Sequence, residues 1–455
     1  MPTTRVLIPA GVLGLGFDQA ALDRGVAAAP DIICIDGGST DSGPFYLGTS
    51  TSKYARSVSK AEWRALMVAR QQAGVPLVIG SCGTCGTREM VDWMYDITTE
   101  LAEEIGHSIS ITRLYSDQQQ STVTAAYEAG QLTPLIPAPP VDAATIKECT
   151  HIVALAGAEH IQAALATGAD IVLAGRTTDT ATIAALPLSR GNHAGGAWHG
   201  AKIGECGAFC TTNPASGVVM ISFDETGFVV EAMAPDAHCT PHSVSAHMLY
   251  ENSNPFILYE PGGHLDVTGA RYSKLDARRV RVEGSIWVPA DAYCVKLEAA
   301  RVGGYQTTML AVIRDENYVT NSEYWVDSLT QFLNQKINQS TDLTSDDYTL
   351  EFRLIGHSAA LGELETKRGK PVEIGVLLII TAADQDTATD LSKLINPFLL
   401  HHPLTADEAL PTFAFPYAPA HSDRGALYEF AMNHVLVLAD PMDGFLLRTD
   451  EVKNG

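Results

Sequence analysis

The sequence predicts an α/β protein in which a parallel sheet carries glycine-rich turns at the ends of its strands. Between the N-terminus and about residue 190, short apolar runs alternate with longer amphipathic patterns, which is typical of strands and helices that follow one another. Three of the apolar runs end directly in turns rich in glycine and small hydroxyl residues, at 36–44, 80–86 and 175–180. This alternation favours a sheet of parallel strands that is covered by helices on both faces.

The expected elements of this N-terminal part follow the pattern in order. Strands are expected at 5–10, 31–36, 75–79, 108–114, 152–156 and 170–174. Helices are expected at 17–29, 59–73, 87–105, 121–129 and 159–167. The helix at 59–73 starts with Ser59-Lys60-Ala61-Glu62, which fits a capping box, and Gly74 is a natural stop at its other end.

After about residue 191 the pattern changes, because glycines interrupt it. Strands at 218–222, 227–231, 279–283 and 292–297 surround a helix at 243–251, and a helix at 320–340 leads into a polar stretch at 338–347. Strands at 348–355, 372–382 and 434–438 accompany a helix at 386–396. A chain of 455 residues is expected to form more than one domain. We expect a parallel α/β domain at 1–190, a mixed α+β region packed on it at 191–340, and a small C-terminal α+β domain at 345–455.

The composition indicates an ordinary globular protein with a strongly acidic balance. Lys and Arg number 30 against 53 Asp and Glu, which gives a formal net charge of −23 and disfavours nucleic acid and anionic membrane surfaces as partners. The apolar runs are far shorter than the roughly 20 residues that a membrane span needs. We expect no leader peptide and a cytoplasmic location, where the eight cysteines would stay reduced. The acidic balance and the α+β tail suggest a homo-oligomer.

The three glycine-rich turns predict a binding site, because the carboxyl ends of parallel strands share one edge of the sheet. Backbone N–H groups and a helix N-terminus at such an edge favour an anionic ligand. The alternative is that these residue types simply make good turns and helix caps. The candidate binding residues are Asp36, Ser39, Thr40, Ser81, Cys82, Gly83, Thr84, Arg176 and Asp179.

Two short motifs bear on cofactors. Cys82-Gly83-Thr84-Cys85 could be a redox motif at a helix start, half of a zinc site, or two small residues packed in a turn. Against a redox motif, the residues before Cys82 are Ile79-Gly80-Ser81 rather than an aromatic-rich segment. Against a zinc site, the sequence has no second pair of ligands at suitable spacing. The glycines at 11–16 have the wrong spacing for a dinucleotide fingerprint, and no NAD or ATP motif is present. The cofactor is unknown, and a divalent metal stays open.

The segment 238–251 is the densest group of chemically active residues. On the helix expected there, with Ser243 as N-cap, His247 and Glu251 lie four residues apart on one face, so a carboxylate could orient an imidazole that acts as general acid or base. The alternatives are a solvated His–Glu pair and a metal site of His238, His242 and His247. Glu205 lies in an irregular segment and Asp41 in the first turn; either could be the second acid or base.

Five segments resemble one known family, the acyclic terpene utilisation (AtuA) proteins. They are 36–44 (DGGSTDSGP), 79–83 (IGSCG), 171–180 (IVLAGRTTDT), 239–251 (CTPHSVSAHMLYE) and 428–434 (YEFAMNH). The resemblance implies a cytoplasmic catabolic protein associated with branched acyl-CoA and hydroxy-acid pathways. Family members usually read Gly-Ser-Ala-Gly at 80–83, so Cys82 and Cys85 are departures. Many members carry a further C-terminal module, which we expect this chain to lack.

Together these observations favour a lyase, a hydratase or an isomerase that acts by proton abstraction on a small hydroxy-carboxylate or a branched acyl-CoA. Arg176 would pair with a substrate carboxylate. His247, oriented by Glu251, would move the proton, with Glu205 or Asp41 as its counterpart. One alternative is a non-catalytic acyl-CoA or metabolite-binding subunit of a catabolic complex, and another is a metal-dependent lyase.

Overall fold

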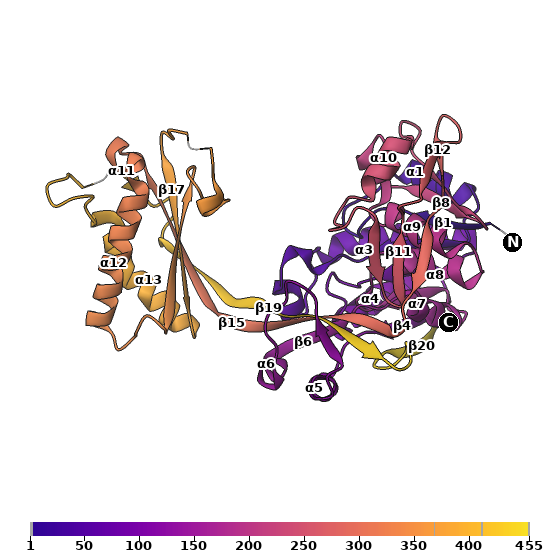
Figure 1. The fold of residues 1–455 in the computed structure, drawn as a ribbon, viewed down its shortest axis with the longest axis horizontal. Coiled ribbons are helices and arrows are strands. Elements are labelled where there is room, and N and C mark those ends of the chain that lie inside the picture. The colour runs from indigo at the N-terminus through magenta and orange to yellow at the C-terminus, as the bar shows by residue number, and fades with distance from the viewer. Residues whose placement is uncertain (1–2, 368, 411–412, 454–455) are drawn as a thin grey trace. The chain divides into compact units, whose positions relative to one another are not determined.

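The computed structural model describes residues 3–367, 369–410 and 413–453, and the chain forms two compact units. Unit 1 combines the residues up to Arg301 with those from Phe430 onward, and unit 2 consists of Val302–Glu429. Two long strands, β15 (Tyr293–Ile313) and β19 (His421–Leu438), contribute residues to both units (Figure 1). The polar stretch 338–347 lies inside unit 2.

A ten-stranded sheet forms the centre of unit 1, in the order β12-β13-β9-β8-β1-β2-β3-β7-β4-β20. The strands from β1 to β4 in this order pair in parallel, which confirms the predicted parallel sheet. These strands are β1 (Thr4–Ile8), β2 (Ile32–Asp36), β3 (Leu77–Gly80), β7 (Ile171–Ala174) and β4 (Ile109–Tyr115). They are buried along almost their whole length, as strands covered on both faces must be.

Antiparallel strands extend this sheet at both edges. They are β8 (Val219–Phe223), β9 (Gly227–Ala232), β12 (Arg271–Lys274), β13 (Arg279–Glu283) and β20 (Leu446–Val452). Next to β1 lie β8, β9, β13 and β12, and β20 pairs with β4 at the other edge. Strands were predicted near β8, β9 and β13 but not at β12 or β20. A separate three-stranded sheet contains β10 (Ile257–Glu260), β11 (Gly263–Asp266) and β14 (Ile286–Pro289).

The helices of unit 1 are α1 (Gln19–Ala27), α2 (Phe45–Thr49), α3 (Arg56–Ala73), α4 (Arg88–Ile105), α5 (Gln120–Glu128), α6 (Ala143–Glu148), α7 (Ala158–Leu165), α8 (Ala181–Ser189), α9 (Ala194–Gly204) and α10 (Pro241–His247). Helices α1, α3, α4, α5 and α7 match predicted helices, whereas α2, α6, α8 and α9 were not predicted. Helix α9 takes up most of the stretch after residue 191 where glycines were expected to interrupt the pattern. The capping box expected at Ser59 is wrong, because α3 begins at Arg56. Glu62 instead accepts a hydrogen bond from the backbone N–H of Gly14 at 2.6 Å, so its carboxylate serves a tertiary contact.

Unit 2 is an antiparallel sheet covered by two helices. Within it, β15 pairs with β17 and β17 with β16. Its elements are β16 (Tyr348–Ile355), β17 (Ile374–Ala382), β18 (Phe413–Ala414), α11 (Glu316–Thr320), α12 (Ser322–Ser340) and α13 (Gln385–His401). In β17 every second side chain is buried, and these side chains share a core with Trp325 of α12 and Ile395 of α13. In unit 1, the first part of β15 pairs with β6 (Cys149–Ala154) and the last part of β19 with β5 (Leu132–Pro134).

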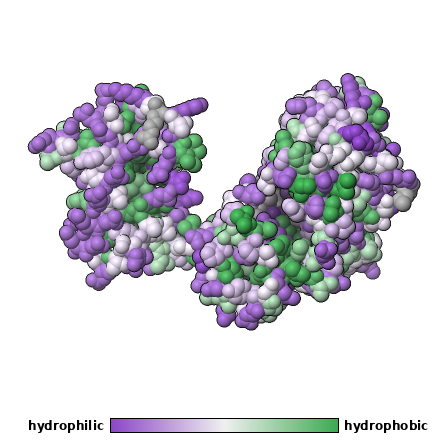
Figure 2. All heavy atoms as spheres, viewed as in Figure 1, coloured by the Kyte–Doolittle hydropathy of each residue, from purple (hydrophilic) through white to green (hydrophobic). Residues whose placement is uncertain are grey.

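The described helices include none that is long and apolar enough to cross a membrane. Hydrophilic and hydrophobic residues are interspersed over the face of each unit that Figure 2 draws. The site described next lies entirely within unit 1.

Candidate functional site

The three glycine-rich turns lie side by side, as predicted, because β2, β3 and β7 are adjacent parallel strands. Backbone hydrogen bonds join each turn to the next. The N–H of Gly37 donates to the carbonyl of Gly80 at 2.8 Å, and the N–H of Ser81 donates to the carbonyl of Gly175 at 2.9 Å. A Cβ on Gly37 would lie 2.5 Å from the Ser81 carbonyl oxygen, so the glycine is needed for this close approach.

The turn at 80–86 is a packed part of the scaffold. The amides of Ser81, Cys82, Thr84 and Gly86 donate to backbone carbonyls. Ser81 and Thr84 adopt φ angles of 45° and 81°, in the left-handed region that side-chain-bearing residues rarely occupy. The four N–H groups are therefore engaged within the protein and are not available to an anionic ligand.

Arg176 is also committed to the protein. Its Nε donates to Glu298 Oε2 at 3.1 Å, and its Nη1 donates to Ser81 Oγ at 3.0 Å. Thr40 Oγ1 donates to the same Glu298 oxygen at 2.9 Å. Arg176 and Glu298 are both buried, and Arg176 Nη1 also lies 3.7 Å from Asp179 Oδ1, so Arg176 pairs with Glu298 on β15 and, at longer range, with Asp179. Through its hydrogen bonds with Thr40 and Arg176, and through the bond from Arg176 to Ser81, the Glu298 carboxylate links the three turns to β15.

Cys82 and Cys85 have no exposed side-chain surface. Burial raises the pKa of the Cys82 thiol well above its ordinary value and raises that of Cys85 as well, so both are protonated at neutral pH. Gly83 has a φ of 60°, and a Cβ there would press against Met90. These features fit the packing interpretation of the CxxC sequence.

A cavity of about 420 Å³ adjoins the first and third turns, and we call it the carboxylate cavity. Its acidic lining residues are Asp36, Asp41, Asp179, Glu205 and Glu251. Ser39 and Tyr250 add hydroxyl groups, and Val12, Leu15, Phe209 and Pro214 add apolar surface. Its described lining contains no lysine or arginine. The cavity is thus suited to hydroxyl groups, cations and apolar chains more than to a bare anion.

Asp36 and Asp179 both line this cavity, and both carboxyl groups have raised pKa values. Burial, followed by the charge of Asp179, raises the pKa of Asp36 well above its ordinary value, while Arg176 opposes the shift. Burial also raises the pKa of Asp179, although that side chain keeps 34% of its surface exposed. Asp36 Oδ1 is buried and has no hydrogen-bond partner. Because the charge of Asp179 disfavours ionisation of Asp36, two such carboxyl groups tend to share one proton.

A second buried group of charges lies where α9 ends. Lys202 donates to Glu205 Oε1. Burial nevertheless raises the pKa of Glu205 to about 8. Glu260 on β10 accepts from Thr180 Oγ1 at 2.5 Å, and burial raises the pKa of Glu260 to about 7.

The predicted pairing of His247 with Glu251 on one helix face is wrong. Helix α10 is capped by Thr240 and ends at His247, and Glu251 follows in a turn with a φ of 50°. The imidazole instead stacks on the ring of Tyr250, with centroids 5.4 Å apart and an interplanar angle of 14°. A hydrogen bond to Glu251 raises the pKa of Tyr250 to about 12. Burial lowers the pKa of His247 to about 4, so the ring is neutral at neutral pH.

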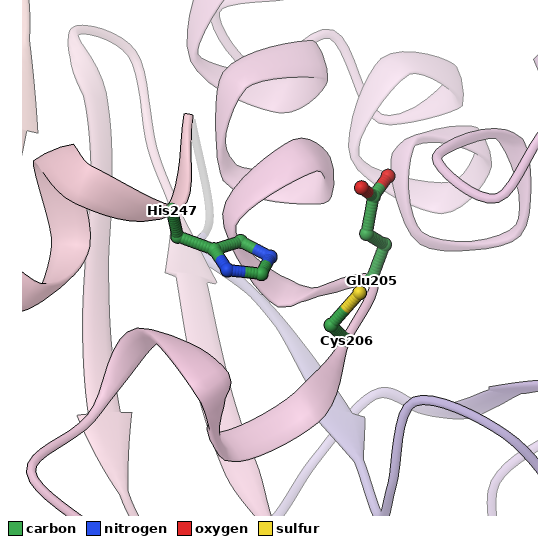
Figure 3. A group of neighbouring side chains, drawn as sticks. All are labelled: Glu205, Cys206 and His247. Atoms are coloured by element: carbon green, nitrogen blue, oxygen red, sulfur yellow. The ribbon is translucent and has the colours of Figure 1, made fainter. Parts of the chain in front are cut away.

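His247 lies next to Glu205 and Cys206. One ligand atom from each of the three side chains falls within 4.8 Å of the other two. Figure 3 shows the imidazole directed from α10 toward the segment that carries Glu205 and Cys206. His238 and His242 are not part of this group, so the metal site considered from the sequence, with three histidines, is not assembled.

Sequence reasoning missed three residues around the cavity: Lys202, Cys206 as the neighbour of His247, and Glu260. Lys202 had a detectable signal, since it is a lone charge in a run of small and apolar residues at 194–204. The other two are placed by long-range contacts and have no local signal.

Comparison with known proteins gives one match. A family model described as "Acyclic terpene utilisation family protein AtuA" matches residues 48–420. The match includes the second and third turns and the cluster of Glu205, Cys206 and His247, while the first turn lies before it. No curated protein matches the chain, and no solved structure matches it.

Proposed function

Because the chain belongs to the acyclic terpene utilisation (AtuA) family, we propose that it is a catabolic enzyme that moves protons on a branched substrate in the carboxylate cavity. The reaction class is a lyase of the hydratase type or an isomerase. The observation that carries the proposal is that Asp36 and Asp179 line one cavity with raised pKa values, and that Asp36 Oδ1 is buried without a hydrogen-bond partner. Strongly perturbed carboxyl groups in a cleft are typical of acid–base sites.

The pair can supply both halves of such a reaction. With one proton shared between two carboxyl groups, the ionised group takes a proton from carbon next to a carbonyl. The protonated group gives its proton to a leaving hydroxyl or to another carbon. In an elimination, the carbon–hydrogen bond breaks, its electrons form a carbon–carbon double bond, and the protonated hydroxyl leaves as water. In an isomerisation, the substrate already has a carbon–carbon double bond, which shifts as one carbon loses a proton and the far carbon of that double bond gains one.

The rest of the cavity fits a branched hydroxylated acyl group. Val12, Leu15 and Phe209 provide apolar surface, and the family description refers to acyclic terpenes, which are branched apolar chains. Asp41 and Glu251 would accept hydrogen bonds from substrate hydroxyls. A volume of about 420 Å³ suits a small acyl unit, and the charged part of a thioester or carboxylate would lie outside the acidic lining.

The eight cysteines are all free thiols, which supports a cytoplasmic location.

Replacing Asp36 with asparagine tests the proposal. The amide keeps the shape of the side chain and cannot take up a proton, so kcat is expected to fall by about 10²–10⁴-fold while ligand affinity changes little. The measurement is steady-state kinetics with a panel of branched 3-hydroxyacyl thioesters and their free acids. Asp23→Asn is the matched control, because Asp23 is exposed on α1 and contacts Gln19.

Two results would overturn the proposal. One is an unchanged kcat in Asp36→Asn on a substrate that the unaltered protein turns over. The other is saturable binding of these ligands without any conversion, which would identify a non-catalytic metabolite-binding subunit.

A further inference from the structure

We propose that Glu205, Cys206 and His247 form a binding site for a divalent transition-metal ion, and that zinc is the ion best suited to this set of donors. The inference stands on the geometry of these three side chains and does not depend on the acid–base chemistry of Asp36 and Asp179. It also differs from the metal site of three histidines that the sequence suggested.

The three donor atoms are already close together. They lie within 4.8 Å of one another, although Glu205 and Cys206 are far from His247 in the sequence. Small side-chain movements would bring a carboxylate oxygen, a thiolate sulfur and an imidazole nitrogen to about 2.0–2.3 Å from a common zinc ion. Figure 3 shows that the three side chains come from two segments, His247 from one and Glu205 and Cys206 from the other.

The imidazole of His247 gives an independent indication of a ligand. Its Nε2 is buried without a hydrogen-bond partner, and the whole residue is only 5% exposed. A buried nitrogen of this kind normally has a partner, because leaving it unsatisfied costs free energy. A metal ion bound to Nε2 would satisfy it.

The surroundings hold the imidazole in place. Tyr250 stacks on the ring, and Phe209 contacts it edge to face with centroids 6.5 Å apart. Cys206 is fixed by a close backbone approach, since a Cβ on Gly11 would lie 2.9 Å from its Cα. Ligands held in position in this way lose little conformational entropy when a metal binds.

The charge around the three donors favours a cation. Asp36, Asp41, Asp179 and Glu251 line the same cavity, whereas Lys202 is the cation that contacts Glu205, at Oε1. We assign the second oxygen, Oε2, to the metal. The field of several carboxylates attracts a divalent ion more strongly than one ammonium group repels it.

The donor types select among metals. Sulfur and imidazole ligands disfavour magnesium and calcium, which take oxygen donors. Three protein ligands with one open position is the arrangement of many catalytic zinc sites. An ion here would face the carboxylate cavity and could hold a substrate oxygen in the open position.

Cobalt(II) provides a direct test, because a thiolate bound to Co²⁺ has a near-ultraviolet charge-transfer band that carboxylate and imidazole lack. Chelator-treated full-length protein is titrated with Co²⁺ and then with Zn²⁺. We expect the charge-transfer band and visible d–d bands to saturate at one ion per chain, and Zn²⁺ to abolish both. Zn²⁺ should also raise the unfolding temperature, because it binds the folded state.

Single substitutions assign the ligands. Cys206→Ser should remove the charge-transfer band. Glu205→Gln and His247→Gln should weaken Co²⁺ binding by at least about tenfold, because losing even a residue that only hydrogen-bonds to a metal ligand costs about 10–100-fold in affinity. Cys294→Ser and His242→Gln are the controls. They alter another partly exposed cysteine and another residue of α10, and both should bind Co²⁺ normally.

Absence of the charge-transfer band in the unaltered protein, or its survival in Cys206→Ser, would overturn the assignment. If His247→Gln fails to fold by circular dichroism, the nearly isosteric Cys206→Ser decides. Asp36→Asn should retain the cobalt spectrum, because Asp36 is not a ligand. The metal proposal and the acid–base proposal can therefore fail separately.

Discussion

Replacement of Gly86 by alanine is expected to destabilise unit 1 by about 3 kcal/mol, through left-handed backbone strain together with overpacking. Gly86 has a φ of 64°, and a Cβ there would lie 2.5 Å from the Arg176 Cα and 2.6 Å from the Gly175 carbonyl carbon. Backbone cannot move aside as a flexible side chain can. The second and third turns would be forced apart at the position where the Arg176 N–H donates to the Gly86 carbonyl at 3.1 Å.

The measurement is urea denaturation of the variant beside Gly74→Ala. Gly74 has a similar φ of 67°, but no atom lies within 4 Å of the Cβ position. Strain alone should therefore cost Gly74→Ala about 1 kcal/mol. If the two variants lose the same stability, the close packing of the two turns is not what Gly86 provides.

The second large effect is expected for Glu298→Gln, which breaks the buried ion pair with Arg176. Removing the carboxylate leaves the buried Arg176 charge without its closest partner, while Asp179 stays 3.7 Å away, so we expect a loss of about 3 kcal/mol at neutral pH. Thr40 and Lys296 also lose the carboxylate that they contact. Glu100→Gln is the control, since its pairs with Arg56 and Lys60 lie at the surface, and it should change the unfolding free energy little.

The stability difference between the unaltered protein and Glu298→Gln should depend on pH. Burial by itself would raise the pKa of Glu298, but the charges of Arg176 and Lys296 lower it to about 2 from an ordinary value of 4.5. A group with a lowered folded-state pKa contributes stability that is fully present above its unfolded-state pKa. That contribution is lost as the pH falls through the folded-state pKa. The unfolding free energies of the unaltered protein and Glu298→Gln should thus converge as the pH falls from about 4.5 to about 2. A constant difference between the two free energies across that range would contradict the ion pair.

Much of the parallel sheet could be predicted because its signal is local. Each buried strand is a continuous apolar run followed by a glycine-rich turn, as at β3 and residues 80–86. Adjacent parallel strands end at one edge by geometry alone. The meeting of the three turns therefore followed from the pattern.

The contents of the site were less predictable, because long-range contacts determine them. Arg176 was expected to bind a substrate carboxylate, and Glu298, far along the chain on β15, takes that position. Thr240 rather than Ser243 caps α10, with Pro241 after it, and the helix ends before Glu251. The proximity of Cys206 to His247 depends on the packing of α10 against the segment after α9, which no local pattern encodes.

The most direct measurement of the central claim is deuterium exchange from solvent into substrate carbon. The full-length protein is incubated in D₂O with the branched 3-hydroxyacyl thioesters, and recovered material is analysed by mass spectrometry. Proton transfer by Asp36 and Asp179 should introduce deuterium next to the carbonyl in the unaltered protein and in Asp23→Asn, and about 10²-fold more slowly in Asp36→Asn. Equal incorporation by Asp36→Asn and the unaltered protein would contradict the assignment of proton transfer to the carboxylate cavity.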